Sequence, residues 1–445
     1  MKFLMVVDKS IRLFLIAVAL SFSQTSVAQK YPLSQIVTSQ PPQIALSRPA
    51  YLKPTALSGL DTYIMRISDA DALGAGQRYY RHYYSKQQPW NSDGTRLILS
   101  IDSSRVYFLN GRTFAYQLTA TNVPEYPKWS NSNPDLMYGV ICCGAVTFVK
   151  YTPSTGTMQN LHTFSEFTDM YLGIGEGNLS DDDRYAPLIG VKNISDLTIV
   201  IYDTLNNAEV SRKSFPGAKG AMDWTSMSPS GQYVVVNIYD SVAGKSVYDI
   251  YDKQMNFLRR LGVYGGGHAD IGYDTAGNEV IVSGHFVGGR GVVVTSTRLS
   301  DGTVQEQLAT AGPNGTDGIV YLPSDYHISC RNTKRPGYCY ISVFSPLYND
   351  LITYPVYTTN SYLYREVFAL KLDGTGAVER FSQDFKAEPT SLTPVLDLAY
   401  QRASMVVPSR DGSLVLFSSD WQDPTSAAII YDYVAGTEVG AVSEP

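Results

Sequence analysis

The sequence predicts an all-β protein, and specifically a seven-bladed β-propeller. Two strand-and-turn signatures alternate along the chain and each occurs seven times, while no stretch carries a long helical periodicity. A four-stranded unit repeated at spacings of roughly 45 to 70 residues is typical of propellers, because one blade cannot bury both faces and blades stack around an axis until the ring closes. The 33 Tyr residues favour pleated, half-buried surfaces. A pair of packed β-sandwiches is the alternative fold that fits the same pattern.

The first signature is a polar turn followed by an apolar strand, as in SPSGQYVVVNI and SRDGSLVLFSS. We place it between the innermost strand of a blade (strand A) and the next strand outward (strand B). Gly, Pro, Asn and Asp in these turns supply the backbone conformations that tight reversals need. The seven copies begin at Trp90, Trp129, Asn178, Ser226, Tyr273, Cys330 and Pro408.

The second signature is a strand, a short turn and another strand, which we assign to the outer strands C and D. Its seven copies begin at Val106, Phe148, Ile199, Val247, Val293, Val367 and Ala428. The strand-like stretch TYIMRISD, from Thr62, precedes the first full unit. We expect it to pair with the last blade and close the ring, so that residues 61–445 form the propeller.

The first 28 residues have the pattern of a secretory signal. Basic residues precede the apolar run LFLIAVAL, and small residues end at Ala28, where we expect cleavage. No Cys follows the cut, which argues against a lipoprotein anchor, and no other run approaches the roughly 18 apolar residues of a spanning helix. We therefore expect an exported protein, periplasmic or secreted, with residues 29–60 as a Pro- and Ser-rich, poorly structured leader.

The charge balance limits the partners. The net charge is −6, and removing the signal makes the chain more acidic because that segment carries three basic residues and one Asp. An acidic chain is a poor candidate for wrapping nucleic acid or anionic lipid. We expect no nucleic-acid partner, no membrane span and a monomer.

The four Cys residues fall into two pairs. Cys330 and Cys339 flank the turn RNTKRPG, and in an exported protein they are predicted to form a disulfide across a hairpin. Cys142 and Cys143 are adjacent in an apolar run, where buried thiols are the first interpretation and a vicinal disulfide the second.

Propeller geometry gathers most of the histidines on one face. The loops that lead into strand A and those that join B to C lie on this face, here called the mouth face, and the A-to-B and C-to-D turns lie on the other, the turn face. Three histidines shortly precede an A-to-B turn, a fourth lies in a B-to-C loop with an arginine, and one lies on an outer strand. In that order they are His82, His268 and His327, then His285 with Arg290, and finally His162.

Residues suited to sugar contact surround these histidines. The run HYYSKQQPW carries Tyr83, Tyr84, Lys86 and Gln87, although alternate members of a strand must face the blade interior. Asp223 and Trp224 lie at the equivalent place one blade before His268.

The stretches GHADIGYDTAGNEVIV, HISCRN and HYYSKQQPWNSDG resemble polysaccharide lyases with a propeller fold, in particular oligogalacturonate lyases and, more distantly, short ulvan lyases. In the former, a His on blade five and a Gln-x-x-His-x-His run on blade six hold a divalent cation against the substrate carboxylate. His268 and His327 match this pattern, whereas Ser324 and Ser329 replace the Gln and the last His. The resemblance therefore implies a Ca, Mn or Zn ion on His268 and His327, completed by Asp270 or Asp325.

These observations favour an exported lyase that cleaves a uronic-acid-containing glycan by β-elimination, with an acidic poly- or oligosaccharide as substrate. The reaction needs positive charge on the carboxylate, a base for the C5 proton and an acid for the leaving oxygen. We assign His82 as base or acid with Tyr83 or Tyr84 beside it. We place His268, His327 and Arg290 on the carboxylate. The expected substrate-binding residues are Lys86, Gln87, Arg290, His285, Asp223 and Trp224.

Two other functions fit the same sequence. One is a non-catalytic propeller that binds glycan or protein at the same mouth. The other is a glycoside hydrolase that uses carboxylates such as Asp223 and Asp270, whose separation would have to match one of the two hydrolytic geometries.

Overall fold

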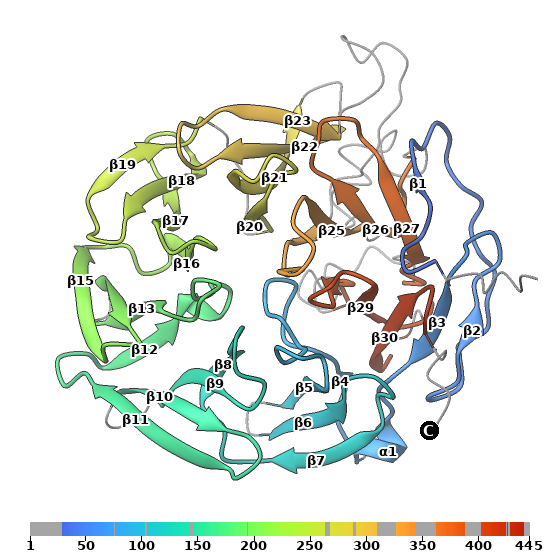
Figure 1. Ribbon diagram of the computed structural model, residues 1–445, viewed down its shortest axis with the longest axis horizontal. Helices are drawn as coiled ribbons and strands as arrows, with labels where there is room; N and C mark the ends of the chain where they lie inside the picture. The colour runs from blue at the N-terminus through green and yellow to red at the C-terminus, as the bar shows by residue number, and fades with distance from the viewer. Residues whose placement is uncertain are drawn as a thin grey trace, which may run out of the picture.

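The computed structural model describes residues 29–74, 76–102, 105–141, 146–193, 195–262, 268–287, 291–308, 326–343, 362–387, 402–423, 425 and 428–439. In these residues the chain forms seven sheets, antiparallel except for one short parallel pairing in the last blade, arranged as blades around one axis (Figure 1). The prediction of a seven-bladed β-propeller is confirmed. The only α-helix among the described residues is α1 (Ala70–Leu73), and none of them forms a helix with the length and apolar character to span a bilayer.

Each blade follows the chain from the axis outward. Blades one to four contain β5 (Arg96–Asp102), β6 (Arg105–Asn110) and β7 (Tyr116–Ala120); β8 (Glu125–Trp129), β9 (Met137–Ile141), β10 (Thr147–Thr152) and β11 (Thr157–Thr163); β12 (Asp169–Leu172), β13 (Tyr185–Val191), β14 (Leu197–Asp203) and β15 (Ala208–Phe215); and β16 (Met222–Met227), β17 (Tyr233–Asp240), β18 (Lys245–Asp252) and β19 (Phe257–Arg260). Blades five to seven contain β20 (Asp270–Tyr273), β21 (Glu279–Val287), β22 (Gly291–Arg298) and β23 (Val304–Leu308); β24 (Tyr326–Ser329), β25 (Tyr338–Val343), β26 (Glu366–Lys371) and β27 (Val378–Gln383); and β28 (Val407–Pro408), β29 (Leu414–Ser419) and β30 (Ile430–Gly436).

The ring is closed by a strand from the other end of the chain. β3 (Tyr63–Arg66) pairs antiparallel with β30, with Ile64 opposite Ala435 and Met65 opposite Val434. This confirms the role predicted for TYIMRISD. The outermost long strand of the last blade is thus β3, and not the end of the chain as the seventh copy of the second signature suggested.

Residues 29–60 are not a poorly structured leader but a strap along the outside of blades six and seven (Figure 1). β1 (Ser34–Gln35) pairs with β27, and β2 (Thr55–Ala56) pairs with β3. The guanidinium of Arg335 lies 3.6 Å from the centroid of the Tyr31 ring, which fixes the start of the strap against blade six.

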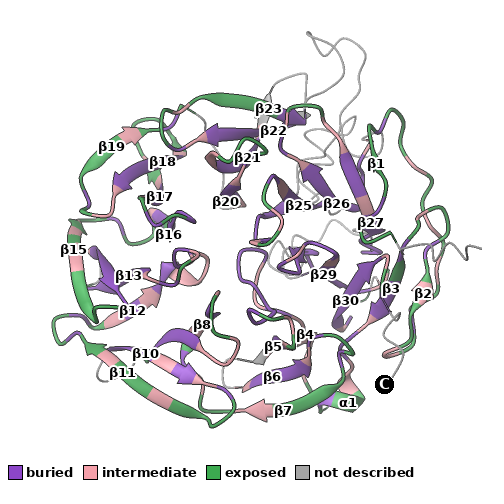
Figure 2. Cartoon of the chain, in the orientation of Figure 1, coloured by how far each residue is buried: buried purple, intermediate pink, exposed green. Residues whose placement is uncertain are grey.

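Apolar side chains fill the spaces between neighbouring blades, while the outer strands are largely exposed (Figure 2). Between blades three and four, for example, Ile199 and Ile201 pack with Val234 and Val236, all fully buried. These β-branched residues lie at alternate positions of their strands, so they point to the same face of each sheet. Burying each such side chain stabilises the fold by about 1.5 to 3 kcal/mol, before entropy is counted.

The predicted disulfide is present, since Cys330 and Cys339 are bonded across the A-to-B hairpin of blade six. Gly272 on β20 makes room for it: a Cβ at this position would lie 2.8 Å from the Cβ of Cys330. The pair Cys142 and Cys143 lies outside the described residues.

Candidate active site

Two of the predicted histidines meet on the mouth face. His327, fully buried on β24, stacks on His268, which precedes β20, with ring centroids 4.2 Å apart and planes inclined by 13°. The ring of Tyr84 stands edge-on to His327 at 5.4 Å and 88°. Blades one, five and six therefore supply one aromatic cluster, here called the histidine cluster, of His268, His327 and Tyr84.

A backbone contact sets the proton arrangement of His268. Its Nδ1 lies 2.6 Å from the carbonyl oxygen of Tyr326, which can only accept a hydrogen bond. Neutral His268 therefore carries its proton on Nδ1 and its lone pair on Nε2. Removal from water lowers the pKa of His268, with the nearby Lys86 ammonium acting in the same direction. The ring is thus a neutral imidazole at pH 7 with the electronic form of a general base.

The second imidazole is still less able to hold a proton. Burial depresses the pKa of His327 well below its usual range, and the charges of His268 and Lys86 add to this effect. Because a proton on one ring opposes a proton on the other, the two rings behave as a coupled pair.

A buried ammonium lies beside the histidine cluster, because Nζ of Lys86 is 5.9 Å from the centroid of the Tyr84 ring. Lys86 is 1% exposed, and its Nζ lies 2.6 Å from a carboxylate oxygen of Glu176 and 4.3 Å from the centroid of the Trp224 ring. Burial raises the pKa of Glu176, and the charge of exposed Asp223 adds to the rise, while Lys86 opposes it. The predicted residues Lys86, Asp223 and Trp224 therefore belong to one charged site with Glu176, which the sequence reasoning missed.

His82 is held elsewhere, so its prediction as base or acid is not supported. Its Nδ1 lies 3.0 Å from Oδ2 of Asp432, and its Nε2 lies 2.6 Å from the carbonyl oxygen of Met405. His82 is 1% exposed and Asp432 is fully buried. Since both ring nitrogens contact oxygen acceptors of the last blade, neither is available to a substrate, and His82 instead joins blade one to blade seven.

Three further candidates take different places. Tyr83 packs with the apolar cluster between blades one and two, and the side chain of Gln87 donates to the carbonyl of Pro127 and accepts from Lys128. Both therefore serve packing between blades rather than the mouth. His285 lies half-buried on β21, opposite Val293. Arg290 lies outside the described residues.

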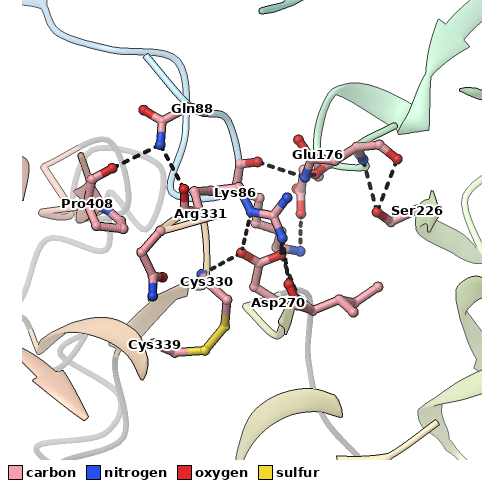
Figure 3. A network of polar contacts seen from close by, with 12 residues as sticks. Lys86, Gln88, Glu176, Ser226, Asp270, Cys330, Arg331, Cys339 and Pro408 are labelled. Carbon is pink, nitrogen blue, oxygen red and sulfur yellow. Dashed lines mark hydrogen bonds and ion pairs between the residues drawn. A yellow bond between two sulfur atoms is a disulfide. The ribbon is translucent and has the colours of Figure 1, made fainter. Parts of the chain in front are cut away.

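The carboxylate of Asp270 is committed to an ion pair (Figure 3). Its two oxygens accept from Nε and Nη2 of Arg331 at 3.0 and 3.1 Å, and the backbone N–H of Cys330 donates to it at 2.7 Å. Asp270 is 4% exposed. A carboxylate bound in this way is neither a hydrolytic acid nor a hydrolytic base, so the hydrolase interpretation that used Asp223 and Asp270 is not supported.

The described residues do not form the metal site that the family resemblance implied. An imidazole holds a metal in the plane of its own ring, and the stacked rings of His268 and His327 lie in two nearly parallel planes. The lone pairs therefore cannot converge on one ion in this arrangement. Asp270 is occupied by Arg331, and Ser324 and Asp325 lie outside the described residues. Among the described residues, no group of three or more His, Cys, Asp or Glu is placed to bind a metal.

Local sequence signals for the missed residue Glu176 do exist. It lies in the Gly-rich run GIGEGN after β12, and a Cβ on Gly177 would lie 1.7 Å from the carbonyl oxygen of Thr225. Glycine thus allows this turn to touch blade four, which brings Glu176 to Lys86. A Gly-rich turn after an innermost strand indicates close approach of backbones, but not which charge it carries there.

The fold and the mouth geometry define a propeller with an aromatic and charged axial site. Solved structures place this fold more closely: it is similar to oligogalacturonate lyase from Vibrio parahaemolyticus, with TM-score 0.56 and 12% identity over 86% of this chain and 96% of that chain. It is also similar to an oligogalacturonate lyase in complex with manganese, with TM-score 0.55 and 10% identity over 86% and 95%. These similarities confirm the predicted resemblance in fold. No protein-family profile and no curated protein sequence matches the chain.

Proposed function

We propose that the mouth-face site catalyses β-elimination in a glycan that contains uronic acid. The observation that carries the proposal is the arrangement of a neutral imidazole, His268, beside the buried ammonium of Lys86. Abstraction of a proton next to a carboxylate needs a neutral base and a nearby positive charge at the same time. The similarity in fold to oligogalacturonate lyases supports the same reaction class.

The residues of this site carry the base, the acid and the positive charge that the reaction needs. Nε2 of His268 takes the C5 proton, and the electrons of the C5–H bond form the C4=C5 double bond. The C4–O bond breaks with its electron pair on oxygen, and the hydroxyl of Tyr84 gives that oxygen a proton. Lys86 offsets the negative charge that develops on the carboxylate as C5 loses its proton. Proton return from His268 to Tyr84, through solvent, completes the cycle.

Export is part of the proposal. The predicted secretory signal lies outside the described residues, but the disulfide between Cys330 and Cys339 supports an oxidising compartment. A periplasmic or secreted lyase would meet acidic poly- or oligosaccharides there.

The test is turnover of defined uronides. Purified protein is mixed with oligogalacturonate, ulvan and glucuronan fragments, with and without Mn²⁺, and the ultraviolet absorbance of the unsaturated uronide is followed. We expect new absorbance on at least one substrate and its loss in His268→Ala. His162→Ala is the matched control, because His162 is exposed on the outer strand β11.

The alternative of a non-catalytic binding propeller gives a different result. If no uronide yields the double bond while the folded protein retains one of these glycans on an affinity column, the site binds without turnover and the lyase proposal is wrong.

A further inference from the structure

A second polar site lies on the axis at the turn face, away from the histidine cluster. It is a cavity of about 20 Å³, enough for one or two water-sized occupants. Three basic side chains line it together with three side-chain amides, and no carboxylate is among its lining residues. These six side chains are Lys128, Arg331, Arg410, Gln88, Asn131 and Asn178. We call this space the cationic cavity.

Lys128 is buried, and no carboxylate of the described residues forms an ion pair with its ammonium. It is 4% exposed, and its Nζ donates to the carbonyl of Gly175 at 2.6 Å and to Oε1 of Gln87 at 3.4 Å. Burial and the charge of Arg331 lower the pKa of Lys128 to about 7, while Glu176 and Asp270 act in the opposite direction from a distance. The direct hydrogen-bond acceptors of this ammonium are neutral.

Arg410 is likewise buried without an ion-pair partner among the described residues. It is 4% exposed and donates to the carbonyls of Trp90, Asn91 and Ser130 and to the amide oxygen of Asn131. All of these acceptors are neutral. Burial lowers the pKa of Arg410 to about 10, which is a large effect for a guanidinium.

The carboxylates nearby are largely engaged by other groups. Asp270 neutralises Arg331 through two hydrogen bonds, while Nη1 of Arg331 has no hydrogen-bond partner among the described residues and can donate into the cavity. Asp183 accepts from the hydroxyls of Ser130 and Ser132 and from the backbone of Asn131. Burial raises the pKa of Asp181 to about 6, so this group is still mostly ionised at pH 7, and its charge acts on Arg331 and Arg410. Three basic side chains thus face a cavity that no carboxylate lines, while Asp270 and Asp181 offset part of their charge from outside it.

We propose that the cationic cavity binds one small inorganic monovalent anion, with chloride as the physiological occupant. Its volume excludes a sugar carboxylate attached to its ring. Lys128, Arg331 and Arg410 supply charged N–H donors, and buried charges are stable when they are paired and hydrogen-bonded.

The proposed anion would hold the blades together at the turn face. Its cationic partners come from blades two, six and seven, and Asn178 adds blade three. The cavity lies toward the turn face, since Arg331 follows His327 by four residues of extended chain, roughly 13 Å. It adjoins the proposed active site, because Lys128 contacts Gln87 and Gly175, the neighbours of Lys86 and Glu176 in the sequence. Its existence does not depend on the proposed lyase activity.

The first experiment compares thermal unfolding of the full exported chain in sodium chloride and sodium gluconate at equal ionic strength. We expect a higher Tm in chloride and a difference that grows with chloride concentration, since only the folded state holds the cavity. In Arg410→Gln and Lys128→Met the difference should disappear. Arg112→Gln is the matched control, because Arg112 is exposed on the same face and should keep the full difference.

The second experiment locates the ion directly. Crystals of the unaltered protein grown in sodium bromide should give an anomalous bromide peak between Lys128 and Arg410. A Tm that is the same in both salts, or bromide peaks at other places only, would overturn the proposal. The bromide experiment needs no variant, so it decides the question even if Arg410→Gln does not fold.

Discussion

Nζ of Lys86 lies 4.3 Å above the ring of Trp224 and 2.6 Å from the carboxylate of Glu176, so one ammonium contacts an aromatic face from blade four and an acid from blade three. Cation and aromatic ring attract by about 2 kcal/mol when water is excluded. The side chain is therefore held in one place beside the histidine cluster, which is what charge stabilisation in a transition state requires.

Replacing Lys86 with Met is expected to lower kcat/KM for the uronide substrate by about 10²-fold, because one preorganised charge is lost. Stability should also fall, since Glu176 is left without its partner. The double variant Lys86→Met, Glu176→Gln removes that stranded acid. It should recover thermal stability but not turnover, and recovery of both would contradict a role in the reaction.

The rate should report the protonation of His268. Because the pKa of His268 is lowered from its ordinary value of 6.5, kcat/KM should hold its plateau through neutral pH and fall only at pH values below 6.5. The acid limb of the pH profile measures this pKa. His268→Gln should lose most of the activity across the whole range, whereas His162→Gln should reproduce the parent profile.

Stability should depend on pH through His327. Above pH 6.5 the ring is neutral in both the folded and the unfolded chain, so the depressed pKa of His327 costs nothing there. As pH falls below 6.5, His327 binds a proton in the unfolded chain but not in the folded chain, so the free energy of unfolding falls.

The matched variant is His327→Phe, measured by urea unfolding at about pH 7.5 and about pH 5, on either side of the ordinary His pKa. Between these two pH values, the free energy of unfolding of His327→Phe should fall by less than that of the parent. Raised pKa values of Glu176 and Asp181 act in the opposite direction, but they are common to both proteins. An equal pH dependence in parent and variant would refute the assignment.

His82 should matter for stability and not for chemistry. His82→Phe removes the ring donor of the buried carboxylate of Asp432, which keeps the hydroxyl of Ser418 and the backbone N–H of residue 82, and losing a hydrogen bond to a charged group costs about 1.5 to 3 kcal/mol. Denaturant unfolding should show this loss, while kcat of the folded fraction stays near the parent value. Adding Asp432→Asn should restore part of the stability, and a large fall in kcat of the folded protein would return His82 to the reaction.

The disulfide should stabilise the A-to-B hairpin of blade six. Replacing Cys330 and Cys339 together by Ser is expected to lower the free energy of unfolding by about 2 to 4 kcal/mol, because the unfolded chain gains freedom. A reducing agent should lower the unfolding midpoint of the parent and leave the double variant unchanged. Equal midpoints for the oxidised parent and the variant would show that the bond contributes nothing.

Much of the fold could be predicted because each turn and strand is indicated by a short stretch of sequence. Each A-to-B turn carries its own polar residues, and each following strand carries its own apolar run, so the repeat is visible without knowing any distant contact. The unpaired strand pattern at Thr62 could be matched to the last blade for the same reason. The strap was missed because β1 and β2 pair through backbone hydrogen bonds, which their Pro- and Ser-rich composition does not reveal.

The site was predicted less well because it depends on side-chain direction. Position before an A-to-B turn was enough to bring His268 and His327 together. The same argument failed for His82, whose ring turns toward Asp432 of the closing blade. Glu176 and Lys128 were not predicted as site residues. Glu176 meets Lys86, and Lys128 lines a cavity with Arg331, only because their blades face each other across the axis of the ring. Spacing along the chain does not reveal such contacts.

The pairing of β3 with β30 also fixes an order of events in the cell. Before β30 is synthesised, β3 has only the two-residue strand β2 as a neighbour, so the ring can close only after the seventh blade has been made. Until β30 is made, Ile64 and Met65 have no apolar surface of the seventh blade to cover them. Assembly is expected to be slow because the contact that closes the ring joins residues more than 300 positions apart in the sequence.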